Sequence, residues 1–142
     1  MEHTQTLRYD ARGAAQVASV SPSRQAFQIL RFAFTVAPIA AGLDKFFNLL
    51  VDWSQYVPAV VGRVLGGNVH GLMLAVGVIE IAAGVGVALR PRLFSHVVAA
   101  WLGVIILSLL LIPGYYDVAL RDLGLALGAL ALGRLGVEHA KG

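Results

Sequence analysis

A single carboxylate, Glu80, stands in the middle of an otherwise apolar run over residues 70–89. About 20 apolar residues are enough for a helix to cross the hydrocarbon core of a bilayer. This run therefore predicts a membrane-spanning helix with Glu80 near its midpoint. A lone charge at that depth costs several kcal/mol or more. We expect Glu80 to face other helices, which must supply its partner.

The residues around Glu80 indicate which face of this helix is packed. Gly77, Ala83 and Gly84 lie at three- and four-residue spacing from Glu80. Small residues allow the backbones of membrane helices to approach each other closely. The stripe predicts that Glu80 points into a bundle.

The composition agrees with a membrane domain. The chain has 142 residues, of which 58% are hydrophobic and 13% charged, and its mean hydropathy is +0.75. An ordinary globular protein carries about 25% charged residues. Lys and Arg are scattered between apolar segments, so we expect no nucleic-acid partner despite a net charge of +3. The absence of cysteine excludes disulfides, thiolate catalysis, Fe–S ligation and covalent haem attachment.

The order of apolar segments predicts an all-α protein, an integral membrane four-helix bundle. Ser21, Pro22 and Ser23 form a signal for the start of a helix. We expect a polar cytoplasmic N-terminal tail over 1–26 and a transmembrane domain over 27–142, with spans at about 27–50, 70–89, 93–112 and 116–135. The fourth span is the least apolar, because Arg121 and Asp122 stand near its start.

Positive charges in the short flanks predict the orientation. They cluster before the first span, in the connection around Pro91 and after the fourth span, so both termini are expected to be cytoplasmic. This pattern corresponds to a multi-pass protein of the inner (cytoplasmic) membrane. On the opposite side, residues 56–65 are expected to form a short interfacial helix. An interfacial aromatic belt is also expected there, formed by Trp53, Tyr56, Tyr115 and Tyr116.

Three of the expected helices carry an ionisable group on the face that we expect to be inside. Lys45 lies on a stripe with Gly42 in the first helix, and Arg121 lies on a stripe with Gly124 and Gly128 in the fourth, where a GxxxG step predicts close packing. The candidate ligand or charge cluster consists of Asp44, Lys45, Glu80, Asp117, Arg121 and Asp122, with His70 at the end of the second helix.

Two interpretations of this cluster remain open. In the first, the charges pair only for structure, with Lys45 or Arg121 neutralising Glu80. In the second, they line a polar cavity, open to the outer side, that binds a polar head group or relays protons. The sequence shows no catalytic nucleophile and no metal site. His70 and His96 are expected at opposite ends of their helices, so they cannot share a haem iron. Trp101 is expected to face lipid or another protein.

Three motifs together resemble the DoxX family of integral membrane proteins. Residues 42–47 (GLDKFF) resemble its first-helix G-x-x-K step, and residues 77–84 (GVIEIAAG) its second-helix G-x-x-E-x-x-x-G pattern. Residues 121–123 (RDL) and 128–130 (GAL) are similar to its fourth helix. The resemblance covers about residues 28–135. It implies a four-helix fold related to the membrane part of thiosulfate:quinone oxidoreductase, with Lys45, Glu80 and Arg121 at the polar positions of the family.

The resemblance implies an accessory or anchoring subunit of a respiratory or redox assembly. Its charged cluster would contact quinone or lipid head groups, and no cofactor would be covalently bound. The expected partners are the lipid bilayer and other membrane or redox subunits. Because the chain lacks cofactor ligands of its own, we do not expect an autonomous enzyme, although one acting on quinone together with partner domains stays open. The alternative is a small proton-coupled permease with Glu80 as the titrating group, which would need a homo-oligomer to form a lumen.

Overall fold

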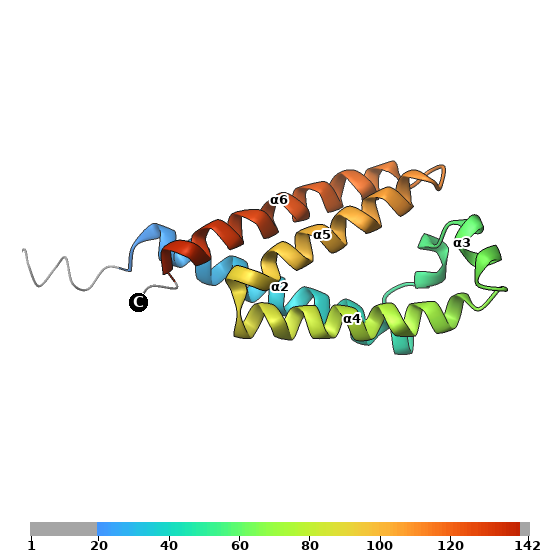
Figure 1. The fold of residues 1–142 in the computed structure, drawn as a ribbon, viewed down its shortest axis with the longest axis horizontal. Coiled ribbons are helices and arrows are strands. Elements are labelled where there is room, and N and C mark those ends of the chain that lie inside the picture. Colours follow the sequence, from blue (N-terminus) through green and yellow to red (C-terminus); the bar gives the residue numbers. More distant parts are fainter. Residues whose placement is uncertain (1–19, 140–142) are drawn as a thin grey trace, which may run out of the picture.

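The computed structural model describes residues 20–139, and four long helices dominate this part of the chain (Figure 1). They are α2 (Pro22–Phe47), α4 (Val69–Leu89), α5 (Pro91–Leu110) and α6 (Tyr116–His139). Two short elements lie between α2 and α4, the 3-10 helix η1 (Trp53–Tyr56) and α3 (Ala59–Val64). The described residues are therefore all-helical, as predicted.

Helix α2 begins at the predicted signal. The side chain of Ser21 caps the helix by accepting a hydrogen bond from the backbone N–H of Arg24 at 3.3 Å, and Pro22 occupies the first turn, where its missing N–H is harmless. The helix thus starts before residue 27, the predicted start of the first span. Residues 1–19 of the predicted tail lie outside the described residues.

Helix α2 also ends earlier than predicted, at Phe47 and not at residue 50. Asn48 adopts a left-handed conformation with φ of 50°, which stops the helix. The carboxylate of Asp44 then accepts hydrogen bonds from the backbone N–H groups of Leu49 and Leu50, at 2.9 and 3.1 Å. A side chain inside the helix therefore fixes the first residues of the loop that follows.

A proline and a glycine set the other two connections. Arg90 alone separates α4 from α5, because Pro91 opens α5 and disfavours helix at the residue before it. Between α5 and α6 the chain turns at Gly114, whose φ is +96°. Helix α3 lies within the region predicted to be an interfacial helix.

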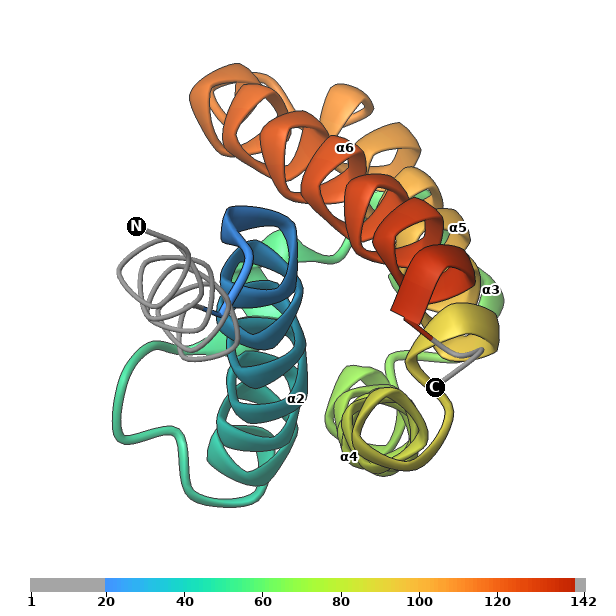
Figure 2. The ribbon, with the colours of Figure 1, turned by 90° about the vertical axis from the view of Figure 1, so that its left-hand side faces the viewer.

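The long helices form two antiparallel pairs, α2 with α4 and α5 with α6 (Figure 1). The pairs lie together where α4 turns into α5 and diverge toward the other end, which holds residues 48–68 and 111–115 and is called the loop end below. Figure 2 shows the same two pairs viewed from the end where α2 begins and α6 ends. The molecule therefore resembles two hairpins that are joined at one end and open at the other.

Glycines set the close approach of α2 to α4. A Cβ on Gly42 would lie 2.6 Å from the carbonyl oxygen of Gly77, and a Cβ on Gly77 would lie 2.6 Å from the carbonyl oxygen of Gly42. At Gly84 a Cβ would lie 2.7 Å from the carbonyl oxygen of Thr35. The stripe of small residues around Glu80 is thus a tight helix–helix contact.

The apolar core joins the two pairs away from the loop end. Val87, Ala129 and Leu132 are fully buried there, and Phe34 reaches across from α2. Three helices, α2, α4 and α5, are long and apolar enough to cross a membrane. Many of their large apolar side chains point outward, among them Phe32, which is 69% exposed. The described part of the chain therefore has the character of a helical membrane protein.

Candidate functional site

A cavity of about 720 Å³ lies between the two helix pairs. All four long helices and the segment around Trp53 contribute to its walls, and most of the lining is aliphatic or aromatic. The lining residues with polar atoms in their side chains are Trp53, Tyr56, Glu80, Trp101, Arg121 and Asp122. The site is thus an apolar chamber with a few polar groups.

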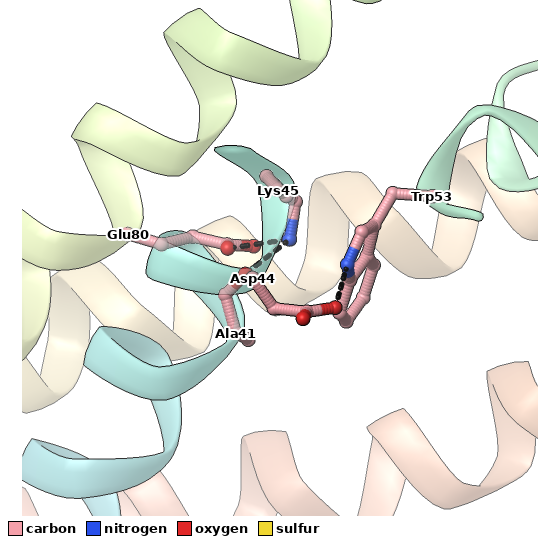
Figure 3. Close-up of polar contacts among 5 residues, drawn as sticks. All are labelled: Ala41, Asp44, Lys45, Trp53 and Glu80. Atoms are coloured by element: carbon pink, nitrogen blue, oxygen red, sulfur yellow. Dashed lines mark hydrogen bonds and ion pairs between the residues drawn. The ribbon is translucent and has the colours of Figure 1, made fainter. Parts of the chain in front are cut away.

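One wall of the cavity holds a buried ion pair. The Nζ atom of Lys45 on α2 lies 2.6 Å from Oε2 of Glu80 on α4, and the two side chains are 3% and 10% exposed (Figure 3). The glycine contact between α2 and α4 brings their backbones close enough for this pairing. Of the two cations expected as partners of Glu80, Lys45 occupies that position. At such low exposure the pair is stable only because each charge has a partner.

Trp53 covers this ion pair from the loop. The ammonium group of Lys45 lies 3.6 Å from the centroid of the Trp53 ring, a cation–π contact. The indole Nε1 of Trp53 donates a hydrogen bond to Oδ2 of Asp44 at 2.7 Å (Figure 3). The two adjacent charges of α2 therefore hold one aromatic ring between them. The sequence analysis assigned Trp53 to the interfacial aromatic belt. Its contact with Lys45 and Asp44 was missed, because Trp53 lies outside the long helices and no helical spacing relates it to these residues.

Trp101 on α5 lies beside the Glu80 carboxylate, and the prediction for this residue was wrong. It was expected to face lipid or another protein, but it lines the cavity. Its buried Nε1 is near Glu80 without reaching hydrogen-bond geometry, and it has no partner among residues 20–139. The second carboxylate oxygen of Glu80, Oε1, likewise makes no hydrogen bond to the described residues. The indole N–H of Trp101 and Oε1 of Glu80 are thus a donor and an acceptor in the same part of the cavity, without hydrogen-bond partners among the described residues.

The opposite wall carries a second ion pair within α6. The Nε and Nη2 atoms of Arg121 both lie 3.0 Å from Oδ1 of Asp122. The side chain of Arg121 is 66% exposed and that of Asp122 only 6%. Arg121 therefore neutralises its own neighbour, and no ion pair joins it to Glu80 in the described structure. The two pairs face one cavity from different helices.

Other members of the predicted cluster lie elsewhere. Asp117 and His70 are exposed and do not line the cavity. The GxxxG step does not form a close helix contact at Gly124, where a Cβ would meet nothing within 4 Å. At Gly128 a Cβ would lie 3.2 Å from the ring of Phe34. Gly124 instead lines the cavity, because the helix pairs diverge at this level.

The loop end of the cavity is covered by contacts between η1 and the α5–α6 turn. The hydroxyl of Tyr115 donates to Oε1 of Gln55 at 3.0 Å, and the rings of Tyr56 and Tyr115 meet edge to face at 5.3 Å. Asp52 caps η1 by accepting hydrogen bonds from the hydroxyl and the backbone N–H of Ser54, and these bonds lower the pKa of Asp52. The segment with Trp53 is thus tied to both helix pairs.

No protein-family profile matches this chain, and no curated protein or solved structure shows significant similarity to it.

Proposed function

We propose that the chain is a DoxX-like protein of the inner membrane that binds a lipid-soluble, quinone-class molecule in the cavity between its helix pairs. In this proposal α6 is a fourth span, both termini are cytoplasmic, and the loop end lies at the outer face. The observation that carries the proposal is the cavity itself, an apolar chamber of about 720 Å³ among the membrane-spanning helices with polar groups at Glu80 and Trp101.

The cavity has the features of a small-molecule site. Such sites measure about 300–1,000 Å³ and combine an apolar lining with a few oriented polar groups. Trp53, Tyr56 and Trp101 offer aromatic surfaces to a flat ring, and aliphatic side chains deeper in the cavity would contact an isoprenoid tail. The ion pairs Lys45–Glu80 and Arg121–Asp122 leave little net charge to attract an ion. A neutral amphiphile fits this environment best.

The proposed role is that of an accessory or anchoring subunit. The chain would hold the quinone-class molecule close to a redox partner in the same membrane, and the partner would carry out the electron transfer. Purification in mild detergent tests this part: a redox subunit should elute together with the chain. Elution of the chain alone from its native membrane would contradict the accessory role without affecting the binding site.

Quenching of tryptophan fluorescence tests the binding site. Both tryptophans of the chain, Trp53 and Trp101, line the cavity, and quinones quench indole emission. Titration of the protein in nanodiscs with a decyl-substituted benzoquinone should give saturable quenching. Ala37→Leu, which narrows the cavity, should weaken the binding about tenfold. Ala40→Leu, on the same helix and outside the cavity, is the matched control. Purely linear quenching in all three proteins would overturn the proposal.

Proton-coupled transport is the second candidate function. It is favoured by one observation, that Glu80 lies at the cavity wall with one carboxylate oxygen free of described partners. A titrating group of a transporter needs such access. Proton flux into liposomes should then fall strongly in Glu80→Gln, and unchanged flux in that variant would remove this candidate.

A further inference from the structure

The exposed residues of the cavity lining are confined to two helices. Of the residues that line it, five are exposed, and all five lie on α2 or α6; these are Ala33, Ala37, Arg121, Gly124 and Leu125. The lining residues of α4 and α5 are buried or half-buried. This distribution points to an opening between α2 and α6, because the lining residues of the other two long helices are more covered.

Small residues form the sides of this opening. Ala33 and Ala37 face it from α2, and Gly124 faces it from α6, where a Cβ would meet no atom within 4 Å. The opening ends where Phe34 meets Gly128, because the Phe34 ring would lie 3.2 Å from a Cβ at that glycine. From Gly128 to Arg121 the helical rise amounts to about 10 Å. A slot of this height admits a ring or a hydrocarbon chain.

The other end of the slot is bounded by the loop end. The contacts of Tyr115 with Gln55 and Tyr56 tie η1 to the α5–α6 turn there. A molecule that reaches the cavity through the slot therefore comes from the side of the helices and not through the loops. Phe32 on α2 and Leu127 on α6 are exposed apolar side chains, and such side chains are suited to contact with hydrocarbon.

We infer that the slot between α2 and α6 is a lateral portal through which a neutral amphiphile passes from the bilayer into the cavity. The inference rests on the proposed function, and it adds the source of the ligand and its route. The head of the molecule would lie by Glu80 and Trp101, and its tail would remain between Ala37 and Gly124. Arg121 lies at the rim, where its long side chain can extend toward lipid head groups.

Substitution of one exposed glycine tests the portal. Gly124→Leu fills the slot without a clash at Cβ, and a helix tolerates leucine better than glycine. Gly103→Leu on α5 is the matched control, since a Cβ there also meets nothing within 4 Å and Gly103 does not line the cavity. In stopped-flow quenching with decyl-benzoquinone in nanodiscs, Gly124→Leu should slow association at least tenfold, and Gly103→Leu should leave the rate within a factor of two.

A reversible block provides an independent measurement. The chain has no cysteine, so Ala37→Cys combined with Gly124→Cys introduces a unique pair of thiols across the slot. A short bis-methanethiosulfonate linker forms a disulfide with each thiol and releases methanesulfinate, and this bridge should stop quinone binding. Reduction of the two disulfides and removal of the reductant should restore it. Each single cysteine variant, treated in the same way, should keep more than half of the association rate.

The outcomes separate the portal from the binding site. Saturable binding that is equally fast in the wild type, in Gly124→Leu and in the linked double variant would overturn the portal and leave the proposed function intact. Absence of saturable binding in the wild type would overturn both the portal and the proposed binding site. Equal slowing by Gly124→Leu and Gly103→Leu would also overturn the portal, because the effect would then be independent of the slot.

Discussion

The ammonium group of Lys45 and the carboxylate of Glu80 form a 2.6 Å ion pair between α2 and α4, directly beside the glycine contact that holds these helices together. The pair connects stability with the candidate site, because Glu80 also lines the cavity. The ring of Trp53 lies against the ammonium group of this pair, 3.6 Å from Nζ to the ring centroid.

Removal of the cation should be more harmful than neutralisation of the acid. Lys45→Ala leaves Glu80 buried without a partner and should destabilise the protein by about 3–5 kcal/mol. Glu80→Gln also leaves a buried charge, but Lys45 keeps the Trp53 ring and can still donate to the amide oxygen of the glutamine, so the loss should be about half as large or less. Thermal unfolding in detergent measures both. Lys45→Met combined with Glu80→Leu should recover most of the loss, and equal melting temperatures for all variants would contradict the buried pairing.

The unpartnered donor and acceptor by the cavity should select the head group of the ligand. Trp101 Nε1 can only donate and an ionised Glu80 can only accept, so a hydroxyl that accepts from one and donates to the other satisfies both. We expect 4-decylphenol to bind about tenfold more tightly than 4-decylanisole, which cannot donate. Native mass spectrometry measures both. Trp101→Phe should reduce this preference, and equal binding of the two compounds to the wild type would refute the selection.

The tyrosine contact at the loop end should restrict access to the two tryptophans. Tyr115→Phe removes the hydrogen bond to Gln55 and keeps the ring contact with Tyr56. Quenching of tryptophan emission by acrylamide should rise about twofold in this variant. Tyr116→Phe is the control, since Tyr116 is 58% exposed and does not line the cavity. Identical quenching of the two variants would show that the contact does not cover the cavity.

The cap of η1 should make the loop sensitive to acid. The pKa of Asp52 is lowered in the folded state by hydrogen bonds from Ser54, so the stabilisation is fully present above the unfolded pKa of about 3.9 and is lost as the pH falls through the lower folded value. Trp53 emission should shift to longer wavelength over this range. Asp52→Asn retains a hydrogen-bond acceptor and should show a smaller shift in emission wavelength. A shift equal to that of the wild type would show that a group other than Asp52 titrates.

Sequence patterns were reliable where the physics is local. Ser21 and Pro22 correctly marked the start of α2, because capping and the proline ring act within one turn. The third span was predicted to start at residue 93, whereas α5 begins at Pro91. The end of α2 was placed three residues too late, since the bonds from Leu49 and Leu50 to Asp44 have no sequence signature.

The inward orientation of the Glu80 side chain was also predictable, because glycines and an alanine at helical spacing from it define the packed face of the helix. Pairing across helices was only partly predictable. The sequence left Lys45 and Arg121 as equal candidates, and the choice depends on which helices lie adjacent. Trp53 and Trp101 entered the site only through the tertiary arrangement, since an aromatic residue in a loop or in mid-helix has no preferred direction in sequence.

By itself, the amino-acid sequence determined that the chain forms long apolar helices and that a buried carboxylate must find a cation, because hydropathy and the desolvation of charge depend on residue type alone. The tertiary structure decided which cation pairs with Glu80 and that the helix pairs diverge around a cavity whose exposed lining residues lie on α2 and α6. Those outcomes depend on the angles between helices, which are set by the summed packing of many side chains and by the length of the connections.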